Sequence, residues 1–426
     1  MNHIVVREYA RLTTALVPPG NLLEAQVSDT AFDWLCQESA RLRNAGAALV
    51  QVEGRRWLRL DNFVGVLETP CGTRIEILPK SVDGAEDAPA ARGLLRRMLT
   101  LCLDLPVRES APTSLEAFDG PLNEWIIRCF LDALVHIVKR GIRFDYHGVK
   151  ECQPFLRGRL DMVKQLRQPP GRAHLFHIEH HIFDADRPEN RLLRSALDIV
   201  RQRTRDPSNW RAAHEMAALM ESVPPSRHIS SDFRRWGNER LLAHYRHARP
   251  WCALILEERS PLSTFGTWNG NSLLFPMEKV FERYVEACLR RQLPAHARLR
   301  RQISTKYLVE HRGARWFNLQ PDFLVESDEG LLLLDTKWKR INQSLDSATD
   351  KYGLVQADLY QLFAYGQRYL AGQGTLALVY PRTKDFRQPI PVFTFAPDLV
   401  LHVVPFDIPS GKLMGELLPG MLETAA

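Results

Sequence analysis

Two apolar runs joined by a short polar turn place the strongest constraint on the fold. Residues 318–340 read NLQPDFLVESDEGLLLLDTKWKR, in which PDFLVE and LLLLDTK flank a turn that ends at Gly330. Apolar runs of this length, bounded by turn residues, are typical of buried strands, and the short connection predicts an antiparallel hairpin. A buried strand has no structural use for Asp335 and Lys337 directly after four leucines, so we expect these residues to serve a function.

The predicted hairpin brings two carboxylates together. Side chains two positions apart on a strand share a face, so Asp335 and Lys337 point the same way. The antiparallel register can place Asp322 beside Asp335, with Cβ atoms about 4.5–5.5 Å apart. Two carboxylates at this distance repel each other unless a cation lies between them, and Mg²⁺ takes a few carboxylate oxygens with its other positions on water or phosphate. We therefore predict a Mg²⁺ site at Asp322 and Asp335, with the backbone carbonyl of Thr336 as a further ligand.

Lys337 fits the same chemistry. A lysine beside a bound metal can orient or deprotonate the attacking water, while the metal stabilises the charge that develops on a scissile phosphate. Together these residues predict phosphodiester hydrolysis. The alternative for Asp335 and Lys337 alone is an exposed ion pair at a strand end, which is common and contributes little free energy.

Two predicted helices supply further candidates. Glu282 lies beside the apolar stripe of FPMEKVFERYVEACLRRQLP and is a further candidate for catalysis and metal binding, with Glu278 one turn earlier as the weaker choice. Gln361 and Tyr365 lie four residues apart in ADLYQLFAYGQRYLAG, so both face one side of that helix. We expect them to position the substrate backbone or a metal-bound water.

Composition limits the class of protein. The chain has 426 residues, 45% hydrophobic and 25% charged, which is typical of a globular protein with more than one domain. No apolar run reaches the roughly 18 residues of a membrane span, and Arg7 and Glu8 stand where a secretory signal would be apolar. The seven cysteines are scattered singly, which favours a reducing cytoplasm. The net charge of +6 permits a nucleic-acid partner without requiring one.

The pattern of apolar residues predicts a mixed α/β protein in three parts. Residues 1–85 form a β-rich N-terminal domain, because short alternating runs between residues 57 and 77 are separated by turn residues. Residues 86–258 form a mainly helical middle region. Residues 259–426 follow the order helix, hairpin, helix, strand, which predicts a mixed sheet flanked by helices.

Four histidines in HLFHIEHHIF raise the question of a zinc site. The four are His174, His177, His180 and His181, and on a strand His177 and His181 share one face while His180 takes the other. Three ligands that converge on one ion are therefore not expected, and solvated or hydrogen-bonded histidines are the default.

The ordered set of Glu282, Pro321-Asp322, Asp335-Thr336-Lys337 and Gln361-x-x-x-Tyr365 resembles the PD-(D/E)xK nuclease superfamily, and QLFAY resembles the signature of its RecB-like branch. Beyond this core the chain resembles the McrC family, the nuclease subunits of McrBC modification-dependent restriction systems. The motifs that carry this resemblance are FLRGRLDM (155–162), FDADRPENRLLRSAL (183–197), FPMEKVFERYV, LQPDFLV, LLLLDTKWKR and YQLFAYG, with IEILPK near the N-terminus.

The resemblance implies a subunit that cuts DNA when docked on a McrB-like hexameric AAA+ GTPase. It implies that the N-terminal region contacts this motor and that the motor reads modified cytosine, so the substrate is double-stranded DNA with modified cytosine. It also implies that Asp322 and Asp335 hold the metal and that Lys337 activates water. The absence of a G-x-x-x-x-G-K-[ST] phosphate loop agrees with this division of labour.

Other residues have two readings under this hypothesis. Arg157, Arg159, Arg191 and Arg194 contact phosphate or the motor, or else lie on solvated faces. Trp338 and Lys339 lie along a DNA channel, or Trp338 belongs to the core.

Two alternative functions stay open. The first is a RecB-like nuclease of another repair or defence system. The second is a non-catalytic adaptor that stimulates an NTPase motor, which gives no reason to keep two close carboxylates.

Overall fold

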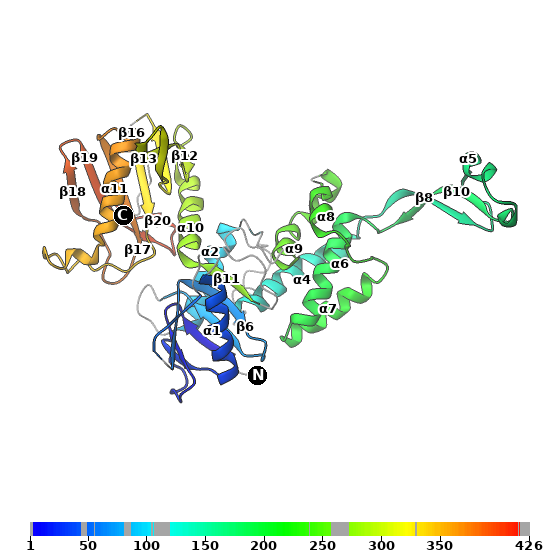
Figure 1. The fold of residues 1–426 in the computed structure, drawn as a ribbon, viewed down its shortest axis with the longest axis horizontal. Helices are drawn as coiled ribbons and strands as arrows, with labels where there is room; N and C mark the ends of the chain where they lie inside the picture. The colour runs from blue at the N-terminus through cyan, green and yellow to red at the C-terminus, as the bar shows by residue number, and fades with distance from the viewer. Residues whose placement is uncertain are drawn as a thin grey trace. The chain divides into compact units, whose positions relative to one another are not determined.

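The computed structural model describes residues 3–43, 49–54, 56–80, 87–103, 105, 120–237, 239–256, 272–328, 330–415 and 417, and the chain is a mixed α/β protein, as predicted (Figure 1). It divides into two compact units. The first combines Met1–Leu105 with Arg259–Ala426, and the second is Pro106–Glu258. The predicted division into three domains stays a prediction.

The N-terminal part of the first unit contains two small sheets, as the alternating runs predict. One sheet has the strand order β1-β7-β6-β11 and the other β3-β2-β5-β4. The elements are β1 (His3–Arg7), β2 (Arg11–Thr13), β3 (Glu24–Gln26), α1 (Asp29–Arg43), β4 (Val50–Val52), β5 (Trp57–Leu60), β6 (Phe63–Glu68), β7 (Arg74–Leu78), α2 (Ala88–Cys102) and β11 (Leu273–Pro276).

The pairing of β11 with β6 joins segments about 200 residues apart in the chain. Gly65 makes this pairing possible, because it has a φ of +128° and an added Cβ would lie 2.0 Å from the backbone oxygen of Leu273. Only glycine accepts both the conformation and the close approach.

The C-terminal part of the first unit is built on a seven-stranded mixed sheet, with the order β12-β15-β16-β17-β19-β18 and β20 paired to β19. β16, β17 and β19 run parallel, and the other strands of the sheet are antiparallel to their neighbours. The elements are α10 (Met277–Gln292), β12 (Arg298–Arg301), β13 (Lys306–His311), β14 (Ala314–Leu319), β15 (Phe323–Ser327), β16 (Gly330–Thr336), η3 (Lys351–Gly353), α11 (Gln356–Tyr369), β17 (Gly374–Pro381), β18 (Ile390–Ala396), β19 (Leu399–Asp407) and β20 (Lys412–Leu413).

The two long helices of this part each bury an apolar face. α11 contributes Leu362, which packs in one buried cluster with Leu333 of β16 and Leu376 of β17. On α10 the apolar stripe predicted from the sequence is buried throughout, from Met277 to Leu289. The sheet therefore holds α11, β15 and β16 in one rigid arrangement, which positions the site described below.

The second unit consists of helices and a long hairpin. β8 and β10 pair antiparallel and extend away from the helices, with the short α5 near the far end (Figure 1). The elements are α4 (Leu122–Arg140), β8 (Asp145–Gln153), β9 (Arg159–Leu160), α5 (Met162–Leu166), η1 (Pro170–Arg172), β10 (Phe176–Asp184), α6 (Pro188–Arg203), α7 (Pro207–Leu219), α8 (Ile229–Arg235), η2 (Arg240–Tyr245) and α9 (Arg249–Leu256).

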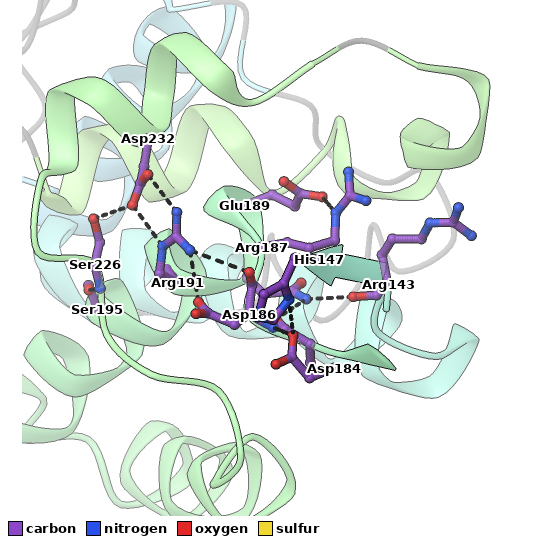
Figure 2. A network of polar contacts seen from close by, with 12 residues as sticks. Arg143, His147, Asp184, Asp186, Arg187, Glu189, Arg191, Ser195, Ser226 and Asp232 are labelled. Carbon is purple, nitrogen blue, oxygen red and sulfur yellow. Dashed lines mark hydrogen bonds and ion pairs between the residues drawn. The ribbon is translucent and has the colours of Figure 1, made fainter. Parts of the chain in front are cut away.

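A network of arginines and carboxylates holds α6 to its neighbours (Figure 2). Arg191 donates to both carboxylate oxygens of Asp232 at 3.1 and 2.9 Å and to Asp186 at 2.8 Å. Ser226 donates its hydroxyl to the same Asp232 at 2.7 Å. Such a bidentate pair fixes the angle between α6 and α8.

No helix in the described ranges combines the length and the apolar character that crossing a membrane requires.

Candidate functional site

The hairpin of β15 and β16 brings the two predicted carboxylates to adjacent positions. Phe323 pairs with Leu334 in the antiparallel register, so Asp322 and Asp335 come next on the two strands. The predicted hairpin and its register are therefore confirmed. Asp335 is 2% exposed although it directly follows a run of leucines.

Asp322 is held by the strand opposite it. The backbone N–H and the hydroxyl of Thr336 both donate to Asp322 Oδ2, each at 2.7 Å. Burial raises the pKa of Asp322 to about 7, and the charges of Asp335 and Glu282 add to the rise, while the bonds from Thr336 oppose it. Burial also raises the pKa of Asp335, against the lowering effect of Lys337.

Lys337 forms an ion pair with Asp335, in which Nζ lies 2.7 Å from Oδ2. Burial alone would lower the pKa of Lys337, but the charge of Asp335 and the hydrogen bond to it raise the pKa above its ordinary value. Lys337 is therefore a cation in the metal-free site. The ion pair of Asp335 and Lys337 is mostly buried. The alternative interpretation of these two residues, an exposed ion pair at a strand end, is therefore wrong.

The two predicted residues of α11 continue the contacts of Lys337. Lys337 Nζ donates to Gln361 Oε1 at 3.3 Å, and Gln361 Nε2 donates to the hydroxyl of Tyr365 at 2.6 Å. Tyr365 in turn donates to the backbone oxygen of Gln320 at 3.0 Å, two residues before Asp322. These hydrogen bonds link α11 to the residues that precede β15 and follow β16.

Glu282 is buried on α10 and has close partners of its own. It accepts from Lys279 Nζ at 2.9 Å and from Gln302 Nε2 at 2.8 Å. Gln302 also donates its backbone N–H to the backbone oxygen of Asp322 at 2.9 Å, so it links Glu282 to the pair. The charge of Glu282 contributes to the raised pKa of both Asp322 and Asp335. The structure thus brings Asp322, Asp335, Lys337, Gln361, Tyr365 and Glu282 into one region, whereas their roles stay predictions.

Asp358 is a site residue that the sequence interpretation missed. It is buried on α11, and its carboxylate lies 3.9 Å from Lys337 Nζ and accepts a hydrogen bond from Lys339 at 2.9 Å. Its position three residues before Gln361 puts it on the same helix face, so this spacing in the sequence could have identified Asp358 as a candidate. Trp338 belongs to the core, where its indole N–H donates to Glu8 at 2.7 Å.

The donor set fits a divalent cation of the Mg²⁺ type. No group of three His, Cys, Asp or Glu side chains suited to a metal occurs among the residues that the structure describes, so a site here has fewer protein carboxylates. Mg²⁺ is commonly bound by one or two carboxylates, with its other positions on water and phosphate. Burial and neighbouring carboxylates raise the pKa of both Asp322 and Asp335, and a bound cation would offset this repulsion.

The arginines and histidines of the second unit divide between internal and exposed positions. Arg191 is committed to Asp232 and Asp186, and Arg194 donates to Asp198 and to backbone oxygens, so neither offers its guanidinium to a phosphate. Arg157 and Arg159 are exposed. His180 is buried with Nε2 3.1 Å from Glu151, on the face of β10 opposite His177 and His181.

Comparisons with known proteins give the family. A sequence model described as "McrBC 5-methylcytosine restriction system component" matches residues 58–381. The "Type IV methyl-directed restriction enzyme EcoKMcrBC" of Escherichia coli K12 is 22% identical over 281 residues, which cover 61% of this chain and 76% of that protein.

Two solved structures from Thermococcus gammatolerans share the fold. One is a half-complex from a tetradecameric assembly of McrB AAA+ hexamers with bound McrC, matched at a TM-score of 0.72 and 19% identity over 95% of both chains. The other is a McrBC complex, matched at a TM-score of 0.52 and 20% identity over 68% of this chain and 88% of that one. The family match spans well over half of the sequence, and this chain therefore belongs to the family of McrBC 5-methylcytosine restriction system components.

Proposed function

We propose that this chain is the McrC-type nuclease subunit of its restriction system and that it hydrolyses phosphodiester bonds of DNA with a PD-(D/E)xK site. The observation that carries the proposal is the pair of buried carboxylates on one hairpin, Asp322 and Asp335, with Lys337 2.7 Å from the second. A structural role does not account for two acids whose pKa values are both raised. A site for a divalent cation accounts for them.

Each residue of the site has a proposed role. Asp322, Asp335 and the backbone carbonyl of Thr336 would hold Mg²⁺, with Glu282 as a further candidate ligand. Bound there, Mg²⁺ supplies charge stabilisation at a scissile phosphate and acidifies water. Lys337 stays protonated in the free site, so it orients the attacking water and neutralises charge on the phosphate. Gln361 and Tyr365 hold the lysine in this direction.

We further propose that the chain works when docked on a McrB-like hexameric AAA+ GTPase and that its substrate is double-stranded DNA with modified cytosine. The names of the related assemblies support this partner. A cytoplasmic location fits the thiol chemistry, since no disulfide joins any of the seven cysteines.

The test is cleavage of a modified plasmid by this chain and its AAA+ partner with GTP and Mg²⁺, with wild type and Asp335→Ala compared side by side. We expect wild type to cut and the variant to lose at least about a thousandfold in rate while it still stimulates the GTPase. Cutting that survives the substitution would place the active site elsewhere.

The same assay separates the alternatives. Cutting by the chain without its partner or GTP would favour a RecB-like nuclease of another system. Stimulation of the GTPase without cutting by either protein would favour an adaptor.

A further inference from the structure

A cavity of about 580 Å³ lies in the first unit, outside the contacts of the hairpin site. Its walls come from the residues that follow β7, β17 and β19 and from the first turns of α2. A volume in this range is typical of a ligand site. The chemistry of its walls indicates which ligand it takes.

The cavity is lined by more cations than anions. Five cationic side chains face two carboxylates, Asp87 and Asp407. The cations are Arg7, Lys80, Arg382, Lys384 and Arg387. Arg382 is neutralised by Asp407 at 3.1 Å, whereas no carboxylate of the described residues lies within ion-pair distance of Lys384 or Arg387. The excess of positive charge favours an anionic ligand.

A buried hydroxyl points to the same kind of ligand. Thr383 is 4% exposed and lines the cavity, and its hydroxyl has no hydrogen-bond partner among the described residues. A buried hydroxyl without a partner is costly, which a ligand oxygen would relieve. The N-terminus of the 15-residue helix α2 contributes Ala90 and Ala91 to the wall, and the side chain of the N-cap residue Asp87 does not cap it. The positive end of the helix dipole favours phosphate at this wall.

The cavity is connected to the nuclease site by one residue. Lys80 lines the cavity, and its Nζ donates to the backbone oxygen of Trp338 at 2.7 Å, directly after Lys337. The strands give a second connection, because β16, β17 and β19 are parallel and their carboxyl ends lie along one edge of the sheet. Two strand spacings of about 4.8 Å separate the end of β16 from that of β19.

We propose that this cavity binds the phosphate backbone of the DNA strand a few nucleotides away from the bond that is cut. The inference rests on the proposed nuclease function. Two strand spacings amount to about 10 Å, so the cavity would hold phosphates close to the bond that is cut. No aromatic side chain lines the cavity within the described residues, so it offers no surface for stacking a base. Backbone contacts of this kind position DNA without reading its sequence, which suits a subunit whose partner recognises the modification.

The test measures binding of a fluorescein-labelled 40-base-pair duplex to the full chain by fluorescence anisotropy, in EDTA and at several salt concentrations. Lys384→Ala/Arg387→Ala removes two cations that have no acidic partner. We expect at least tenfold weaker binding, and a slope of log affinity against log salt that is smaller by about two. The matched control Arg11→Ala/Arg300→Ala removes two exposed cations paired with Glu53 and Glu326, and we expect it to bind within about twofold of wild type.

Thr383→Val adds a readout without a change in charge. Loss of one hydrogen bond from a hydroxyl to a phosphate oxygen should weaken DNA binding about tenfold or more and leave the salt slope unchanged. The inference is overturned if wild type does not bind the duplex, if Lys384→Ala/Arg387→Ala binds like wild type, or if the control loses as much affinity. Because the assay contains no metal, failure to cut DNA with binding intact would count against the proposed function alone.

Discussion

At the scale of single residues, the raised pKa of Asp322 makes the metal-free site sensitive to pH. The folded protein holds the proton of Asp322 up to a pH of about 7, far above the ordinary value of 3.8. Ionisation therefore costs folding free energy as the pH rises between these two values. In the folded chain this cost is a direct measure of how unfavourable the site is without a cation.

Asp322→Asn removes that cost. In EDTA we expect the variant to melt at the same temperature as wild type near pH 4 and a few degrees higher at pH 8, with the difference levelling off above pH 7. Thermal unfolding at intervals of one pH unit measures it. The same substitution at the exposed Asp346, Asp346→Asn, is the control for the exchange of a carboxylate for an amide. Equal melting temperatures of wild type and Asp322→Asn at pH 8 would show that ionised Asp322 does not destabilise the folded protein.

We expect Tyr365 to affect cleavage indirectly, through its hydrogen bond with Gln361. Tyr365→Phe removes the hydroxyl that fixes Gln361 and with it the direction of Lys337, so we expect about tenfold slower cleavage. Tyr369→Phe is the matched control, because its hydroxyl bonds to backbone groups of Ile303, Leu319 and Lys306. Both variants should lose about 1 kcal/mol of stability. A similar loss of cleavage in both would assign the effect to stability instead.

At the scale of elements, the packing of α11 on the sheet determines where Gln361 and Asp358 lie. Gly366 is the point of closest approach, since an added Cβ would lie 2.8 Å from Leu399 Cδ2 and 3.2 Å from Leu376 Cδ1. A larger side chain there would lift the helix from β17 and β19.

Gly366→Leu should therefore lower the free energy of unfolding by about 1–3 kcal/mol, as overpacking of a core does. Gln367→Leu places the same side chain at the next, exposed position of α11 and should change stability by less than about 0.5 kcal/mol. Urea unfolding of both variants measures the difference. Equal stabilities would contradict close packing of α11 on the sheet.

The elements also divide what the sequence predicts from what it does not. The hairpin register and the buried stripe of α10 follow from local periodicity and turn residues, and the structure confirms both. The helical spacing of apolar residues in LNEWIIRCFLDALVHIVKRG likewise predicts a helix that stops at Gly141, and α4 confirms it. The hairpin of β13 and β14 was missed because its side chains are largely exposed and do not alternate. The pattern of SSDFRRWGNERLLAHYRHAR predicts one Arg-rich amphipathic helix, and this prediction is wrong, since α8 ends at Arg235 before Gly237.

Contacts between segments that are far apart in the sequence could not be predicted from local patterns. β11 completes a sheet with β6, and Trp338 bonds to Glu8, yet neither pairing leaves a periodic trace. Asp358 and the cationic cavity depend on such contacts too, which is why the two predicted strand carboxylates were the easiest part of the site to find.

At the scale of the whole molecule, the division into two compact units predicts that a substitution that destabilises one unit leaves the stability of the other unchanged. Arg191→Lys keeps the charge but loses the bidentate contact with Asp232, so we expect the second unit to lose about 1–3 kcal/mol. Amides of α6 and α8 should then exchange faster with deuterium, while those of β15–β17 stay unchanged. Arg201→Lys, with a single longer contact to Asp198, is the control. Faster exchange in β16 would contradict independent units.

The central claim is that Asp322 and Asp335 hold a divalent cation, and binding of Mn²⁺ followed by electron paramagnetic resonance tests it most directly. Asp358→Asn is the matched control, since Asp358 is also a buried carboxylate near Lys337 but not a proposed ligand. The account predicts that wild type and Asp358→Asn take up Mn²⁺ with loss of the free-ion signal, and that Asp322→Asn and Asp335→Asn do not. Equal uptake by all four proteins, or uptake by none, would contradict it.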